Sequence, residues 1–134
     1  MIINKENYQI LDTKEVNLHD DTLSSIFFDR NRKQLKVKCT KASKQHQEYI
    51  IHFDNVIGFQ ISACDFWGAS ECILDFQSVS HENAILIPNL IEEWQKTPDF
   101  IPEPDYDDFI EVLFTLTSGD RLRIACESIE IELI

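Results

Sequence analysis

The stretch that decides the predicted fold is residues 49–76, YIIHFDNVIGFQISACDFWGASECILDF. It contains three apolar runs, residues 49–53, 56–63 and 72–76, which are separated by breaks of polar or small residues. Within each run the apolar residues alternate with the others. Alternation with a period of two places one set of side chains on one face of a half-buried sheet. We therefore expect three strands here, and we expect the rest of the chain to pair with them or to cover them.

Two hairpins are predicted on either side of this stretch. Residues 22–29 and 34–40 form the first, and the connection between them contains Asp and Asn, which suit turns. Residues 109–117 and 121–126 form the second, with Gly119 in its turn. The alternation changes phase after this second hairpin, which predicts a bulge near Glu127 and Ser128.

One short helix is predicted at residues 89–96, NLIEEWQK. Pro88 suits the first turn of a helix, and Pro98 stops it. We expect this helix to place Trp94 on the sheet. The following segment, residues 99–108, contains two prolines in DFIPEPDYDD and is predicted to be a loop.

The fold class that follows is mainly β, a β-rich α+β protein. Roughly seven to nine strands with hairpin connections and no repeated βαβ pattern favour antiparallel pairing. We expect a sandwich, or a curved and partly closed sheet, with one short helix. A chain of 134 residues is expected to form a single domain, residues 1–134.

The composition of the chain indicates which kinds of partner and which cellular location to expect. The formal net charge of −12 argues against nucleic acid or an anionic membrane surface as the partner, because both are bound through cationic surface. It is compatible with a basic protein partner, and equally with solubility alone. No apolar run approaches the roughly 18 residues of a membrane span, and the N-terminus has no secretory signal pattern. We therefore expect a cytoplasmic protein.

The cysteines carry no metal-binding or catalytic spacing. The four are scattered through the chain, and we expect buried free thiols. They are Cys39, Cys64, Cys72 and Cys126. The sequence also lacks the common nucleophile, zinc-protease and phosphate-loop motifs, so we expect no enzyme and no cofactor.

One alternative is a small metal-binding protein or enzyme. His19 lies beside Asp20, and His52 lies two residues from Asp54. Imidazole and carboxylate groups are metal ligands, but two separate pairs without a local spacing motif are a weak signal. Turn caps and a hydrogen-bonded histidine on a sheet explain the same residues.

A second alternative follows from how the charges are distributed. Seven of the twelve basic residues lie in the first hairpin and the loop after it, with no acid between the first and the last. They are Arg30, Arg32, Lys33, Lys36, Lys38, Lys41 and Lys44. The acids of residues 99–111 form the opposite cluster. Pairing of the two clusters between copies would make the chain a self-associating structural module and a homo-oligomer.

The acidic loop is the candidate binding surface. Carboxylates mixed with aromatic side chains can dock on a basic surface, because the charges steer the encounter and the rings anchor it. The candidate partner-binding residues are Glu103, Asp105, Tyr106, Asp107 and Asp108. A solvated loop whose aromatic residues pack into the core explains the same pattern.

Three short motifs carry a resemblance to known proteins. They are Leu18-His19-Asp20 before the first hairpin, Phe53-x-Asn55-Val56 at the end of a strand, and Trp67-Gly68. The chain resembles small, acidic, uncharacterised bacterial proteins that are similar to the immunity proteins of polymorphic toxin systems. The resemblance covers residues 18–76 and implies no catalytic residues. It implies a non-enzymatic inhibitor that binds a cationic toxin domain, such as a nuclease.

Overall fold

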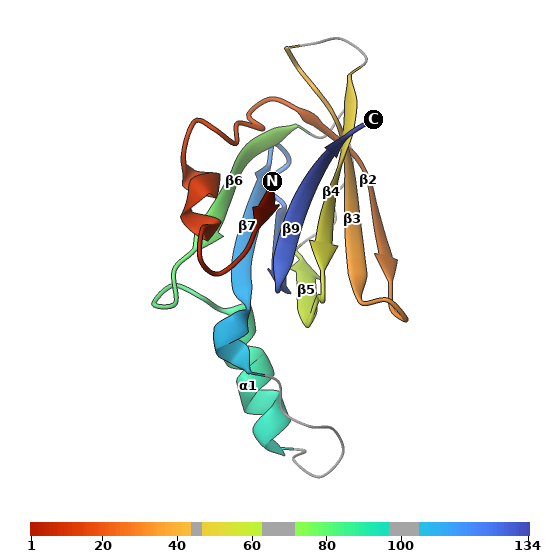
Figure 1. Cartoon of the computed structure of the whole chain (residues 1–134). Coiled ribbons are helices and arrows are strands. Elements are labelled where there is room, and N and C mark those ends of the chain that lie inside the picture. The colour runs from red at the N-terminus through yellow and green to blue at the C-terminus, as the bar shows by residue number, and fades with distance from the viewer. Residues whose placement is uncertain (44–46, 63–71, 97–104) are drawn as a thin grey trace.

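The computed structural model describes residues 1–43, 47–62, 72–96 and 105–134, and its strands form two antiparallel sheets packed face to face (Figure 1). The mainly β fold class and the antiparallel pairing are therefore confirmed. Sheet A has five strands, in the order β1 (Ile2–Ile3), β9 (Ser128–Leu133), β4 (Glu48–Asp54), β3 (Gln34–Thr40) and β2 (Thr22–Asp29). Sheet B has four, in the order β5 (Gly58–Ile61), β8 (Arg121–Cys126), β7 (Ile110–Leu116) and β6 (Ile73–Val79).

The core lies between the two sheets. On β4 the side chains of Tyr49, Ile51 and Phe53 are completely buried, as their alternation predicted. Phe76 and Phe114 of sheet B stack with their ring centroids 4.1 Å apart, and Phe53 meets both rings edge-on. Such arrangements of aromatic rings add to the stability that burial alone supplies. The strands of residues 49–76 therefore supply core residues to both sheets, although β5 and β6 lie at the edges of sheet B.

The chain crosses between the sheets at two neighbouring points. The first lies between β4 and β5, where Asn55 has a φ of 50°, and the second lies at Glu127, between β8 and β9. Asn55 Nδ2 donates to Glu127 Oε2 at 2.8 Å, and the Glu127 N–H donates to the Asp54 carbonyl at 3.0 Å. The predicted bulge at Glu127 and Ser128 is therefore wrong. The phase of the alternation changes there because β9 belongs to the other sheet.

One edge of the sandwich is joined by backbone hydrogen bonds. Thr22 at the start of β2 forms an antiparallel bridge with Cys72, just before β6. The Ile73 N–H donates to the Asp21 carbonyl, and the Asp20 N–H donates to the Ile73 carbonyl, both at 2.8 Å. Each strand also has an irregularity in its register close to the bridge. The two sheets do not form a closed barrel, but backbone hydrogen bonds link them along this edge.

The irregularity in β6 corrects one part of the predicted strand pattern. Cys72, Leu74 and Phe76 were expected on one face, yet Leu74 is 44% exposed while Ile73 and Phe76 are buried. The register shift lies between Ile73 and Asp75. A bulge of this kind moves the following side chains to the other face.

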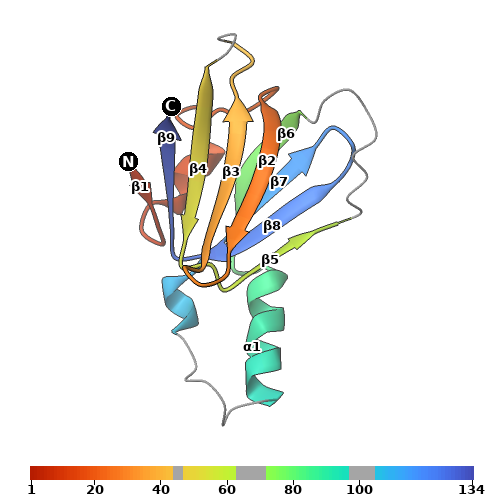
Figure 2. The same cartoon turned by 90° about the vertical axis from the view of Figure 1, so that its right-hand side faces the viewer.

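Helix α1 (Leu86–Lys96) extends from one end of the sandwich and contacts β5 and β8 (Figures 1 and 2). It begins three residues before the predicted start, and Pro88 lies in its first turn as expected. Gly58 lets it approach, because a Cβ there would lie 3.0 Å from Leu90 Cδ1. Leu90 and Ile91 pack beside the sheet. Trp94 is half-buried, and its position on the sheet stays a prediction.

Two short 3-10 helices complete the described part of the chain. The first, η1 (Tyr8–Asp12), packs on β6, where Asp12 accepts hydrogen bonds from the N–H and the hydroxyl of Ser78. The second, η2 (Tyr106–Asp108), precedes β7. Among the described residues, no helix has the length and apolar character that crossing a membrane requires.

Candidate functional site

The acidic loop is described from Asp105 onward, and it forms a short turn of 3-10 helix. Asp105 Oδ1 accepts a hydrogen bond from the Asp107 N–H at 3.1 Å, so this carboxylate caps the start of η2. Short acceptors are favoured at such positions because they satisfy backbone donors that the helix leaves free. Glu103 lies outside the described residues.

Asp108 forms an ion pair with a residue from the N-terminal segment. Lys5 Nζ lies 2.6 Å from Asp108 Oδ1, and both side chains are about half exposed. The hydrogen bond and the charge of Asp108 raise the pKa of Lys5. Because the pair is exposed to solvent, it adds little to stability. The contact lies between the N-terminal segment and η2, so Asp108 already has a cationic partner within the chain.

The ring of Tyr106 contributes to a small apolar cluster separate from the main core. Ile87, Phe109 and Ala125 are its buried members, and Tyr106 packs against them half-buried. The cluster joins η2 to the start of α1 and to β8. Of the predicted site residues that the structure describes, Asp107 is exposed and Tyr106 is turned toward the protein.

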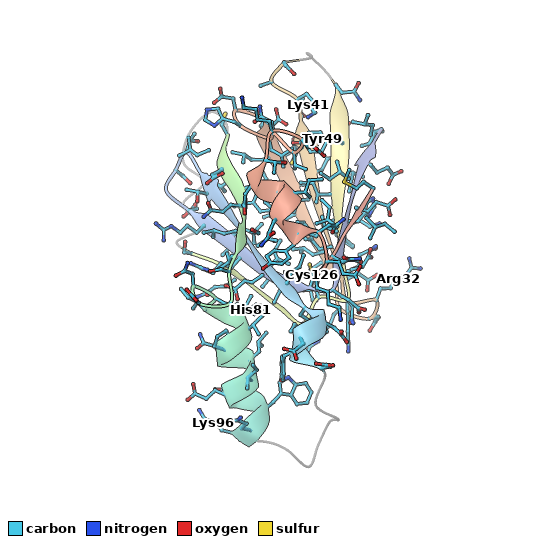
Figure 3. All side chains as sticks on the ribbon, turned by 60° about the vertical axis from the view of Figure 1, so that its left-hand side comes forward. Arg32, Lys41, Tyr49, His81, Lys96 and Cys126 are labelled. Atoms are coloured by element: carbon cyan, nitrogen blue, oxygen red, sulfur yellow. The ribbon has the colours of Figure 1, made fainter. Side chains whose placement is uncertain are left out.

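A surface depression of about 300 Å³ lies beside η2. Its apolar part includes Phe109, Ile110 and Ile87, while Glu6 and Asp107 contribute exposed carboxylates. The remaining lining residues are Lys5, Tyr8, Val79, His81, Ala84 and Glu111. Figure 3 shows His81 near the start of α1, which locates the depression between the helix and the sandwich. This is the candidate functional site.

The wall of the depression depends on a buried carboxylate that sequence analysis missed. The Glu111 side chain is 1% exposed and accepts hydrogen bonds from the backbone N–H groups of Ile85 and Ile87, at 3.0 and 2.9 Å. Arg123 on the neighbouring strand β8 pairs with it at 3.1 Å. Glu111 alternates with Ile110 and Val112 along β7, yet all three are buried, because both faces of β7 are covered here. The start of α1 and Arg123 cover the outer face, and neither contact is visible in a local pattern.

A second buried polar cluster lies at the opposite end of the sandwich, where Figure 3 shows Lys41 and Tyr49. Asp21 is 3% exposed and accepts from the Tyr49 hydroxyl at 2.6 Å and from the Ala42 N–H at 2.9 Å. Lys41 Nζ lies 3.7 Å from the same carboxylate and 5.0 Å from the centre of the Tyr49 ring. These contacts make Asp21 a structural anchor at this end of the sandwich.

The histidine pairs do not form the alternative metal site. His19 Nδ1 lies 2.8 Å from the Leu74 carbonyl, and its Nε2 lies 3.5 Å from Asp20. His52 projects from sheet A and its Nε2 lies 2.7 Å from Glu132. Asp54 accepts instead from Gln34. Within the described residues, no group of three or more His, Cys, Asp or Glu side chains could hold a metal ion.

The cysteines that the structure describes are free thiols. Cys39 and Cys126 are buried, as predicted, whereas Cys72 is half-buried. Burial raises the pKa of Cys39 to about 12 and raises that of Cys126 as well. A thiol that stays protonated at neutral pH is a poor nucleophile. Cys64 lies outside the described residues.

The basic cluster runs from one end of the sandwich to the other, with Lys41 at the end away from α1 (Figure 3). Figure 2 shows the turn between β2 and β3, which carries Arg30, Arg32 and Lys33, at the same end of the sandwich as α1. η2 lies at that end too. Of the other basic residues, Lys38 pairs with Glu48 at 3.2 Å, and Lys44 is outside the described residues.

Comparisons with known proteins leave the family open. No family model matches the chain, and no curated protein matches it either. Among solved structures, an uncharacterized protein from Neisseria gonorrhoeae is similar at a TM-score of 0.47 and 19% sequence identity. That similarity covers 100% of this chain and 99% of the other.

Proposed function

We propose that this chain is a non-enzymatic binding protein whose partner is a basic protein. The observation that carries the proposal is the depression beside η2, in which the exposed carboxylates of Glu6 and Asp107 adjoin the apolar side chains of Phe109 and Ile110. A long basic side chain has an apolar stem and a charged head, and the apolar and acidic groups of the depression suit these two parts.

An arginine or lysine of the partner would use both parts of this site. Its hydrocarbon stem would lie along Phe109 and Ile110, and its charged head would reach Glu6 and Asp107. Arginine would bind better than lysine, because its planar guanidinium can make two parallel hydrogen bonds to one carboxylate. The net charge of −12 would attract a cationic partner from a distance and speed association.

The most concrete form of the proposal is an immunity-type inhibitor that acts in the cytoplasm. A nuclease domain binds phosphates through cationic surface. Carboxylates docked on that surface would occupy the places of phosphates and block access to nucleic acid. The resemblance of residues 18–76 to bacterial proteins similar to immunity proteins supports this form, as does the acidic surface.

The test compares three versions of the tagged protein as bait in a lysate of its native organism. They are the wild type, an E6Q/D107N variant, and an E15Q/D75N control that loses the same charge at two exposed positions elsewhere. We expect mass spectrometry to find one basic protein that the wild type and the control retain and that salt releases. The E6Q/D107N variant should bind it at least tenfold more weakly.

Equal retention by all three versions would show that binding uses another surface. Loss of the partner from both variants alike would mean that overall charge, and not this depression, drives binding. Recovery of no basic protein would overturn the proposal itself.

A further inference from the structure

None of the described helices and strands covers the outer face of sheet A, and the side chains on this face are regularly arranged. Figure 2 shows this face toward the viewer, with sheet B behind it and α1 below its edge. The strand register aligns the outward side chains in rows that run across the strands. One row consists of Phe27, Lys36, His52, Glu130 and Ile2, from β2, β3, β4, β9 and β1.

The neighbouring row repeats the same order of charge. It consists of Ser25, Lys38, Ile50 and Glu132. In both rows the base stands on β3 and the acid stands on β9, with β4 between them. Along these two rows the face is therefore basic on the β3 side of β4 and acidic on the β9 side.

These two rows are complementary to themselves. A two-fold axis running along β4, between two such faces, exchanges β3 with β9 and leaves each row at its own height. Glu130 of one copy then lies over Lys36 of the other, and Glu132 lies over Lys38. Two-fold symmetry makes each of these contacts twice.

The same two-fold rotation brings the two apolar ends of the first row together. Phe27 and Ile2 are large apolar side chains that are 61% and 58% exposed. The axis along β4 places Phe27 of one copy over Ile2 of the other. Exposed apolar residues at the rims of a charged face thus find apolar partners, which removes both from water.

We propose that a second copy of this chain packs on the outer face of sheet A, around a two-fold axis along β4. The basic partner proposed above uses a different surface, so neither proposal rests on the other.

Lys36 and Glu130 are the pair that carries most of the expected complementarity. Among the described residues neither makes an ion pair within the chain, whereas Lys38 pairs with Glu48 and His52 with Glu132. Lys36 and Glu130 stand two strands apart, at about 10 Å, with His52 of β4 between them. In the two-fold arrangement each meets an opposite charge without giving up an existing contact. The pair also stands on the strands next to the axis, where the twist between two packed sheets displaces it least.

The face is small for an interface between two proteins. Five strands at about 4.8 Å and about six residues at about 3.3 Å give a face of about 500 Å² per copy. This is smaller than the roughly 800 Å² per partner of standard interfaces. We expect a dimer with a dissociation constant in the micromolar range, and one that salt weakens because its ion pairs are partly exposed.

The experiment is sedimentation velocity across about 1 to about 500 μM protein at low salt. The wild type is expected to shift from monomer to dimer. A K36E variant sets carboxylate against carboxylate in both contacts, and an E130K variant sets ammonium against ammonium. Each alone should associate at least tenfold more weakly than the wild type. An equal mixture of the two should dimerise again, because the mixed dimer has opposite charges at both contacts.

The mixture also controls for folding, because two unfolded variants could not restore association. A K14E variant and an E92K variant make the same charge changes at exposed positions away from this face, and both should dimerise as the wild type does. A wild type that stays monomeric throughout would overturn the proposal. So would single variants that associate normally, or a mixture of the two that remains monomeric.

Discussion

Single residues far from the candidate site hold the fold together. Asp21 joins the start of β2, the middle of sheet A and the chain after β3 through one buried carboxylate. The carboxylate is buried away from water, and each of its two oxygens accepts a hydrogen bond from the protein. Removing such an acceptor costs more than the bond itself, because the buried donors are left without partners.

We predict that Asp21→Ala lowers the free energy of unfolding by about 3 kcal/mol, since the Tyr49 hydroxyl and the Ala42 N–H both lose their acceptor. Tyr49→Phe removes only one donor and should cost about 1 kcal/mol. Urea unfolding at neutral pH measures both changes. Asp75→Ala, at an exposed position, is the control and should have little effect. A cost for Asp21→Ala no larger than that of the control would show that the cluster is dispensable.

Stability is expected to fall at alkaline pH for a related reason. Burial raises the pKa of Cys39 to about 12, and it also raises the pKa values of Tyr49 and Cys126 above their ordinary values of 10.0 and 9.0. Above about pH 9 the unfolded chain therefore binds fewer protons than the folded chain, so the free energy of unfolding decreases as the pH rises.

Urea unfolding between pH 7 and about pH 10.5, in reducing buffer, measures this slope. A C39A/C126A variant should be less stable at pH 7 because it loses core volume, yet its stability should decline less steeply with pH. If the stability of the wild type is constant or rises over this range, the pKa values of these buried groups are not raised in the folded chain.

At the scale of elements, local patterns predicted strands better than the connections between them. The bounds of β2, β3 and β8 match the predicted ones, because alternation and turn residues lie within a few positions of each other. Helix α1 begins at Leu86 and not at Asn89 because a carboxylate from β7 accepts hydrogen bonds near its start. Glu111 is 24 residues from Ile87 in the chain, so no local pattern reveals that contact.

We predict that Glu111→Ala loosens the start of α1 and lowers the free energy of unfolding by about 3 kcal/mol. The change removes the acceptor for two backbone N–H groups and leaves Arg123 without its buried partner. Hydrogen exchange should accelerate at Ile85 and Ile87, and urea unfolding gives the cost. Glu111→Gln keeps one acceptor oxygen, so its free energy of unfolding should lie between those of Glu111→Ala and the wild type. Unchanged exchange at both amides would show that the helix does not need this anchor.

At the scale of the whole molecule, the candidate site forms where segments distant in the chain meet. Lys5, His81 and Asp107 line the same depression. The acidic character of residues 105–108 is visible in the sequence, whereas the contact of Asp108 with Lys5 is not. The same holds for the face of sheet A. The lysines of β3 stand out in the sequence, but only the strand register aligns them with the glutamates of β9.

The pairing of β1 with β9 has a mechanical consequence. These strands are antiparallel, with Ile2 opposite Glu130, so both chain termini leave sheet A close to the same end of this pair. A force that pulls the termini apart would act across the strands, and it would load the backbone hydrogen bonds one after another. Such unzipping needs much less force than shearing a row of bonds at once. β1 would peel away first and expose the edge of β9, while the linked edge at Thr22 and Cys72 carried no load.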